Sequence, residues 1–175
     1  DHKSSRGLGD VYKRQTILDG KKTSNDIKDE IAHEVNSIIS NGDRPPHLAA
    51  VIVGNDGASL TYVGSKVRAC EKVGFDSTLV SLDDSISEKE LLDKVYELNN
   101  DKKIDGYIVQ LPLPEHIDTQ KVLLAVDPKK DVDGFHPVNF GRMALNLPTF
   151  ISATPNGIME LLKSCLLYTS DAADD

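Results

Sequence analysis

The sequence alternates between short apolar runs rich in β-branched residues and longer segments in which apolar residues recur at helical spacing. The first run, Leu48–Val53, lies between a Pro-Pro pair and Gly54, which is typical of a buried strand. Residues 77–82 and Ile104–Gln110 predict two further strands. Strands that alternate with helices form right-handed parallel βαβ units. We therefore expect an α/β fold with three layers, in which a mainly parallel sheet carries helices on both faces.

The helices are predicted from apolar spacing and from capping residues. Helical spacing predicts helices that begin near Thr23, Ser59, Ser87, Thr119 and Thr154. Thr23 and Ser87 each open a capping-box pattern, in which an acidic residue follows three positions later. Thr154 before a proline is typical of an N-cap followed by the first helical residue. The stretch 127–137 is predicted to be a loop.

The two ends of the chain do not continue this pattern. Residues 10–15, DVYKRQ, can be encoded by a DNA sequence whose reverse complement encodes residues 165–170, CLLYTS. Both strings resemble translated adapters from transposase-based sequencing libraries. We therefore expect residues 1–15 and 165–175 to be adapter-derived segments without fixed structure. Residues 16–164 are then expected to form one domain, truncated from a longer protein, whose last residues could begin a linker helix.

Composition limits the classes of protein to which the chain can belong. The formal net charge is −8, and it becomes −7 without residues 1–15 and 165–175. An acidic domain disfavours nucleic-acid binding, which requires a basic surface. No apolar run has the length of a membrane span, and no signal-peptide pattern precedes Thr16. Only Cys70 remains outside the two ends, which fits a reducing cytoplasm and excludes an internal disulfide.

Tyr62 and Lys66 are the first candidate site residues. They are four positions apart, so they share one face of the predicted helix and border its apolar stripe. Partial burial would lower the pKa of the Lys66 ammonium toward the range in which it exchanges protons at neutral pH. The Tyr62 ring could stack on a flat ligand. The alternative is a lysine whose stem covers apolar surface and a half-buried tyrosine with no ligand.

Further candidates follow the third predicted strand. Gln110 ends that strand, and its amide can both donate to and accept from a ligand, although it could also be a structural tie. Pro112 and Pro114 stiffen the loop that follows.

A short acidic segment offers a last set of candidates. Asp131 and Asp133 could hold a cation, and His136 is a weak metal or base candidate. The alternative is a simple turn with Asp133 and Gly134 at its corner. The sequence offers too few ligands for a metal site, so no metal is expected.

In their order along the chain, these motifs resemble the bifunctional methylenetetrahydrofolate dehydrogenase/methenyltetrahydrofolate cyclohydrolase family. The matching strings are YVGSKVRACEKVGF, GYIVQLPLP, KDVDGFHPVNFGRM and ATPNGIMELL, and ILDGKKTSNDIKDEI is similar to the family's start. The resemblance covers Thr16–Ser164, with one departure, Ala153, where many members have cysteine. The family interconverts 5,10-methylene-, 5,10-methenyl- and 10-formyl-tetrahydrofolate in one-carbon metabolism and purine biosynthesis.

The resemblance also implies a role for each candidate residue. Tyr62 would pack on the pterin, and Lys66 would be the acid and base of the cyclohydrolase step. Gln110 would orient Lys66 and tune its pKa, and Asp133 would bind the amino and ring nitrogens of the pterin. Ser59 and Pro112 would be the remaining residues of the substrate cleft.

The resemblance further implies that NADP binds a second, Rossmann-like domain that is missing here, so no cofactor-binding residue is expected in this chain. We expect the fragment to be impaired or inactive in hydride transfer. The full-length protein is expected to be a cytoplasmic homodimer with tetrahydrofolate derivatives, and neither nucleic acid nor membrane, as its partners. Two alternatives remain. The first is another two-domain dehydrogenase, which is disfavoured by the combination of Tyr62, Lys66, Gln110 and Asp133. The second is a non-catalytic folate-binding module, which titration with a folate analogue would test.

Overall fold

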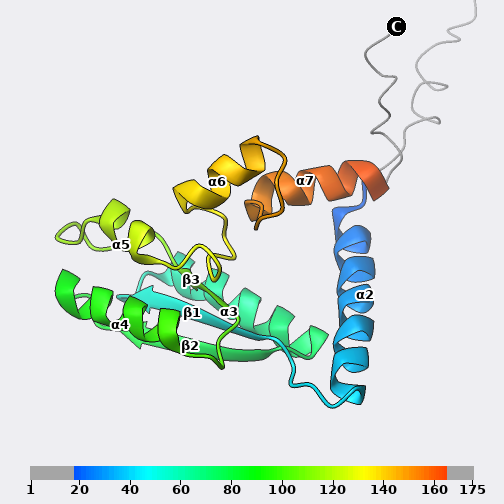
Figure 1. Cartoon of the computed structure of the whole chain (residues 1–175), viewed down its shortest axis with the longest axis horizontal. Coiled ribbons are helices and arrows are strands. Elements are labelled where there is room, and N and C mark those ends of the chain that lie inside the picture. Colours follow the sequence, from blue (N-terminus) through cyan, green and yellow to red (C-terminus); the bar gives the residue numbers. More distant parts are fainter. Residues whose placement is uncertain (1–17, 165–175) are drawn as a thin grey trace, which may run out of the picture.

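A computed structural model describes residues 18–164 of the chain. The predictions made for residues 1–15 and 165–175 lie outside the described residues. Within them, helices and strands follow in the order α2 (Gly20–Ser40), β1 (His47–Val53), α3 (Gly57–Val73), β2 (Asp76–Leu82), α4 (Glu88–Asn100), β3 (Gly106–Val109), α5 (Thr119–Ala125), α6 (Pro137–Ala144) and α7 (Ala153–Ser164) (Figure 1).

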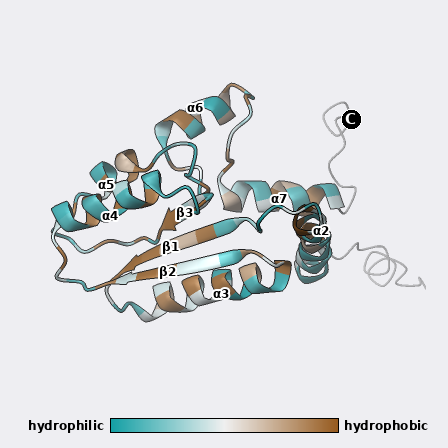
Figure 2. Ribbon diagram, turned by 60° about the horizontal axis from the view of Figure 1, so that its bottom comes forward, coloured by the Kyte–Doolittle hydropathy of each residue, from teal (hydrophilic) through white to brown (hydrophobic). Residues whose placement is uncertain are grey.

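The three strands form one parallel sheet in the order β2-β1-β3. In the middle of the sheet, Ala50 of β1 pairs with Leu79 of β2 and with Ile108 of β3. Helix α3 covers one face of the sheet, and α4 and α5 cover the other (Figure 2). The expected three-layer α/β fold is therefore confirmed.

The central strand explains why the first apolar run is continuous rather than alternating. Ala49 and Val51 face the cluster made with α4 and α5, whereas Ala50 and Ile52 face Val63 of α3. All four strand residues are buried. A strand that is covered on both faces needs apolar residues at every position.

Three expected helix starts are wrong, each by a few residues: α3 begins at Gly57 rather than at Ser59, and α2 and α7 also begin earlier than expected. Helix α2 begins at Gly20, because the Asp19 carboxylate accepts a hydrogen bond from Lys22 N at 2.9 Å and caps the helix before Thr23. Helix α7 begins at Ala153, so Thr154 lies inside its first turn. The capping box of α4 is confirmed, since Ser87 N donates to the Glu90 carboxylate at 3.0 Å and Glu90 N donates to Ser87 Oγ at 3.3 Å.

Helix α6 was not expected from the sequence. It begins directly after His136, whose Nδ1 accepts a hydrogen bond from Val138 N at 3.2 Å, and Pro137 occupies its first turn. Histidine is an uncommon N-cap, so the local signal for this helix is weak.

Helices α2 and α7, from opposite ends of the described chain, lie next to each other (Figure 1). The hydroxyls of Thr23 and Ser164 are 3.1 Å apart. Among the helices within residues 18–164, none combines the length and the apolar character needed to cross a membrane.

Candidate active site

Helix α3 presents Tyr62 and Lys66 to a cleft beyond the carboxyl ends of β1 and β3. The Asp56 carboxylate caps the helix by accepting a hydrogen bond from Ser59 N at 2.8 Å, and Gly74 ends it with a φ of 82°. Val63 is buried against the sheet. Tyr62 and Lys66 flank this buried stripe, which lets them border the core and still reach the cleft.

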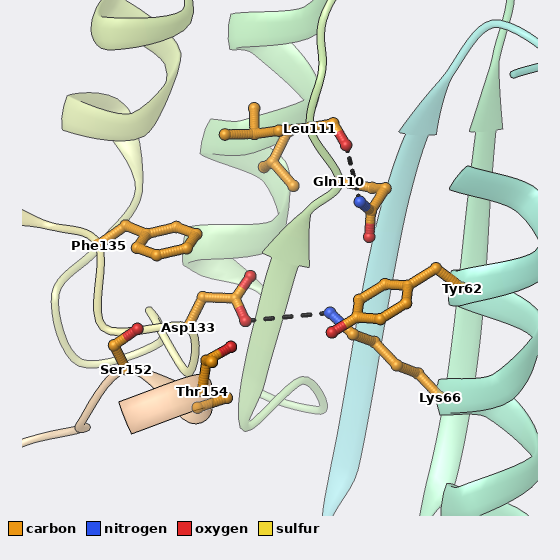
Figure 3. Close-up of a pocket in the computed structure, with 10 residues that line it drawn as sticks. Tyr62, Lys66, Gln110, Leu111, Asp133, Phe135, Ser152 and Thr154 are labelled. Carbon is orange, nitrogen blue, oxygen red and sulfur yellow. Dashed lines mark hydrogen bonds and ion pairs between the residues drawn. The ribbon is translucent and has the colours of Figure 1, made fainter. Parts of the chain in front are cut away.

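The Lys66 ammonium has two partners inside the cleft (Figure 3). Its Nζ lies 3.9 Å from Asp133 Oδ1 and 4.7 Å from the centre of the Tyr62 ring. The side chains of Lys66 and Asp133 are 26% and 23% exposed, so the ion pair is partly shielded from water. Tyr62 is 55% exposed and leaves much of its surface open to a ligand. The structure therefore brings together three groups that the sequence separates by up to 71 positions.

Two glycines allow the Asp133 loop to pack closely against its neighbours, the sheet at Gly106 and the Ser152 segment at Gly134. A Cβ at Gly106 would lie 2.2 Å from Val132 Cγ1, so only glycine permits the loop to lie against β3. Gly134 has a φ of 69°, and a Cβ there would lie 2.9 Å from Ser152 N. Burial raises the pKa of the Asp133 carboxyl, while the nearby Lys66 ammonium opposes that rise. Asp133 thus enters the cleft as a partly desolvated acid facing a cation.

Gln110 enters the cleft from the end of β3. Its backbone N–H donates to Val51 O at 2.8 Å, and its side-chain Nε2 donates to Leu111 O at 2.7 Å. No hydrogen bond joins Gln110 to Lys66 within the described part of the chain, although both side chains line the same cavity. The orienting role expected for Gln110 stays a prediction.

The candidate residues line two adjoining cavities. The first, of about 210 Å³, is lined by Tyr62, Lys66, Val109, Gln110, Leu111, Asp133, Phe135, Ser152, Ala153 and Thr154. The second, of about 340 Å³, is lined by Asp56, Ala58, Ser59, Tyr62, Gln110, Leu111 and Pro112. Because Tyr62, Gln110 and Leu111 belong to both, we treat the two cavities as one cleft.

Ser59 and Pro112 therefore lie at the end of the cleft away from Asp133. Ser59 is 7% exposed, and Pro112 follows a cis peptide bond from Leu111.

Among the lining residues that were not expected from the sequence, three carry an aromatic ring or a hydroxyl group: Phe135, Ser152 and Thr154. Phe135 directly follows the Asp133–Gly134 corner and faces Tyr62 across the cavity (Figure 3). Thr154 belongs to the TPNG motif, so its helix start was the available signal. Ser152 has no local signal, because its place depends on the close approach of its backbone to Gly134.

Asp131 and His136 serve the loop rather than the cleft. Asp131 is 6% exposed, and its carboxylate accepts a hydrogen bond from His136 N at 2.8 Å. His136 caps α6. Within residues 18–164, no three His, Cys, Asp or Glu side chains are grouped so as to hold a metal ion.

A larger groove of about 650 Å³ runs between α2, α3 and α7. Apolar side chains such as Ile27, Val73 and Leu161 dominate its walls, and Lys66 and Ala153 border both this groove and the cleft. The lining of the groove is predominantly apolar, whereas in the cleft a cation, a carboxylate and an amide line one small cavity, as expected of a site that orients a polar substrate. We therefore place the candidate active site in the cleft, despite its smaller volume.

A cleft beyond the carboxyl ends of parallel strands in which a lysine, a tyrosine, an amide and a carboxylate meet is typical of small-molecule binding sites in α/β domains. The sequence model of the tetrahydrofolate dehydrogenase/cyclohydrolase catalytic domain matches residues 18–133. The chain belongs to this family.

Relatives and solved structures agree with this assignment. The chain is 71% identical over 154 residues to the bifunctional protein FolD of Flavobacterium johnsoniae, covering 88% of this chain and 52% of that protein. The FolD protein of Porphyromonas gingivalis is 60% identical over 147 residues, which cover 84% of this chain and 50% of that protein. The chain thus spans about half the length of the curated relatives it matches.

The bifunctional FolD dehydrogenase/cyclohydrolase from Campylobacter jejuni has a similar structure, with a TM-score of 0.82 at 43% identity over 85% of this chain and 53% of that chain. The Trypanosoma brucei methylenetetrahydrofolate dehydrogenase-cyclohydrolase, solved with NADP cofactor and an inhibitor, gives a TM-score of 0.80 at 32% identity over 85% of this chain and 51% of that chain.

Proposed function

We propose that this chain is the folate-binding part of an enzyme that oxidises 5,10-methylenetetrahydrofolate to 5,10-methenyltetrahydrofolate with NADP and hydrolyses the product to 10-formyltetrahydrofolate. The observation that carries the proposal is the convergence of Tyr62, Lys66, Gln110 and Asp133 on one cleft. The names of the relatives, which describe bifunctional enzymes of this kind, support it.

Each residue has a role that its geometry supports. The exposed ring of Tyr62 offers a face on which a pterin can stack. Asp133 faces the cavity as an acceptor for the amino and ring N–H groups of the pterin. Ser59 and Pro112 line the far end of the same cleft and complete the substrate site. These contacts hold the one-carbon unit of the substrate near Lys66.

Lys66 manages the protons of the hydrolytic step. Water adds to the carbon of the methenyl cation, and unprotonated Lys66 takes a proton from that water. The ring then opens by cleavage of one carbon–nitrogen bond, and Lys66 returns the proton to the nitrogen that leaves. The carbinol oxygen loses its remaining proton to solvent as the formyl C=O bond forms, so the hydrolysis releases one proton overall. Gln110 lies at the same cavity and would orient the amine during this exchange.

When bound, NADP would accept the hydride from the substrate. The described residues, however, do not form a suitable binding site for NADP. The strand-to-helix turn with two glycines, Gly54 and Gly57, opens α3, and the Asp56 carboxylate already caps that helix. Hydrogen bonding to Ser59 N lowers the pKa of Asp56, so a negative charge stands where a pyrophosphate would have to bind. We therefore propose that NADP binds to a second domain of the full-length protein.

We further propose that the whole protein acts as a homodimer in the cytoplasm and supplies one-carbon units for purine biosynthesis. The family resemblance supports the dimer and the pathway. The free, buried thiol of Cys70 is compatible with a reducing compartment. Gel filtration of the full-length protein would test the dimer.

The proposal is tested at Lys66 in a full-length relative. Replacing the matching lysine with methionine should abolish conversion of methenyl- to formyltetrahydrofolate, because methionine cannot carry a proton. Replacement with arginine keeps the positive charge beside Tyr62 and Asp133 but cannot release a proton at neutral pH, so it should preserve binding and still stop hydrolysis. Undiminished hydrolysis by the methionine variant would contradict the assignment. Full hydrolysis by the arginine variant would limit the role of Lys66 to its charge.

A further inference from the structure

A buried polar cluster lies behind the loop that carries Asp133. It consists of Asp131, Asn139 and Thr149, which we call the Asn139 clamp. Asp131 and Asn139 are only 6% and 4% exposed. Asn139 Nδ2 donates to Asp131 Oδ2 at 2.9 Å and to Pro128 O at 2.9 Å, and its Oδ1 accepts from Thr149 Oγ1 at 2.8 Å. The Asn139 side chain therefore joins three separate segments of the chain.

Two of these segments form walls of the cleft. The Asp131 carboxylate accepts hydrogen bonds from His136 N at 2.8 Å and from Phe135 N at 3.4 Å, which closes the loop around Asp133. Thr149 lies three residues before Ser152, whose backbone approaches Gly134 on that loop. The clamp thus fastens the loop with Asp133 to the segment with Ser152.

The clamp acts on the cleft only indirectly. Asn139 and Thr149 line a different cavity, of about 510 Å³, which shares no lining residue with the cleft. Neither residue lines the cleft that holds Tyr62 and Lys66. Any effect of Thr149 on a ligand in the cleft must therefore pass through the position of the Asp133 loop or of the Ser152 segment.

We propose that Asn139 and Thr149 are positioning residues that act through Asp131, holding Asp133 opposite Lys66 and holding the Ser152 segment against Gly134. The proposal rests on the proposed function, in that tetrahydrofolate is the ligand whose binding reports the position of Asp133. A fully paired buried network keeps one geometry, whereas a network with a missing partner loosens.

Thr149→Val and Thr149→Ser in the complete 175-residue chain form the matched pair of variants. Valine has nearly the shape of threonine but leaves Asn139 Oδ1 without its donor, which is costly in a buried site. Serine keeps the hydroxyl and should behave as the parent chain does. The comparison isolates one hydrogen bond.

The first measurements need no ligand. Hydrogen exchange of the His136 amide should accelerate by roughly tenfold in Thr149→Val, because local opening exposes it, while the Ala50 amide of the central strand should not change. The carboxyl pKa of Asp133, followed by NMR, should fall toward its ordinary value as loop opening hydrates it. An equal acceleration at Ala50 and His136 would show that the hydroxyl supports only global stability and would overturn the proposal.

The last measurement is tetrahydrofolate affinity by calorimetry, which should weaken by roughly tenfold in Thr149→Val and remain unchanged in Thr149→Ser. Unchanged affinity in a valine variant whose His136 amide exchanges faster would overturn the positioning role. If the parent chain itself does not bind tetrahydrofolate, the proposed function fails. The clamp is then decided by the two measurements that need no ligand, and an unchanged His136 exchange rate or an unchanged Asp133 titration in Thr149→Val would overturn it.

Discussion

The two faces of the sheet carry very different amounts of apolar packing. The face under α4 and α5 holds a large cluster that includes Leu91, Tyr107 and Val122, all nearly inaccessible to water. The face under α3 holds a small one, centred on Ile52 and Val63. The cleft opens beside the face with the smaller cluster, since Tyr62 and Lys66 of α3 line it. In this domain, therefore, most of the apolar packing that stabilises the fold lies under α4 and α5. Close packing on that face does not have to leave space for a ligand.

The largest expected loss of stability is in the cluster under α4 and α5. Leu91→Ala should lower the free energy of unfolding by about 2–5 kcal/mol, because it removes a fully buried side chain and leaves a cavity. Urea denaturation measures the loss. Tetrahydrofolate affinity of the folded variant should be unchanged, and a parallel loss of affinity would show that the two faces are coupled.

A smaller effect is expected where the loop meets the cleft. Gly134→Ala places a side chain at positive φ, which costs about 1–2 kcal/mol, and also pushes its Cβ against Ser152 N. Gly42→Ala is the control, because Gly42 has a φ of 92° with open space around it. Thermal unfolding should show both costs, but only Gly134→Ala should weaken tetrahydrofolate binding. Equal binding by both variants would argue that the close approach to Ser152 does not shape the cleft.

Two carboxylates extend the comparison to pH. Burial raises the pKa of Asp133 in the folded state, so the folded chain retains that proton longer and loses stability as pH rises from the ordinary value of 3.8 through the raised one. Asp105 behaves oppositely. Its hydrogen bond with Arg44 lowers its pKa, so its contribution is present above the ordinary value and is lost as pH falls through the depressed one.

Urea denaturation from about pH 3 to pH 7 separates the two carboxylates. As pH rises, the free energy of unfolding of Asp133→Asn should increase relative to that of the parent chain. The free energy of unfolding of Asp105→Asn should decrease relative to that of the parent chain. Slopes of the same sign would mean that Asp133 is not desolvated by the cleft.

The smallest expected change in stability is at Lys66. Its ion pair is 3.9 Å long and partly exposed, so Lys66→Met should alter the free energy of unfolding by less than about 1 kcal/mol. The same change should abolish the hydrolytic activity of the full-length enzyme. A loss of stability as large as that of Leu91→Ala would place Lys66 in the core rather than in the active site.

Local patterns in the sequence are enough to predict the strands, most helices and the class of fold. Leu48–Val53 indicates a buried strand from its own apolar run, and Ser87 and Glu90 cap α4 through residues three positions apart. The errors at Thr23 and Thr154 are local too, since each helix begins a little earlier than its expected cap. Order among the motifs also indicated the family.

The way the site is built, in contrast, depends on contacts between distant segments. The pairing of Lys66 with Asp133, the entry of Ser152 and the Asn139 clamp all join segments that meet because of sheet order and close loop packing. A glycine such as Gly106 or Gly134 indicates in the sequence only that another segment can approach closely, because glycine has no side chain. Which backbone approaches it depends on the whole fold, because such contacts form between residues that have no local means of recognising each other.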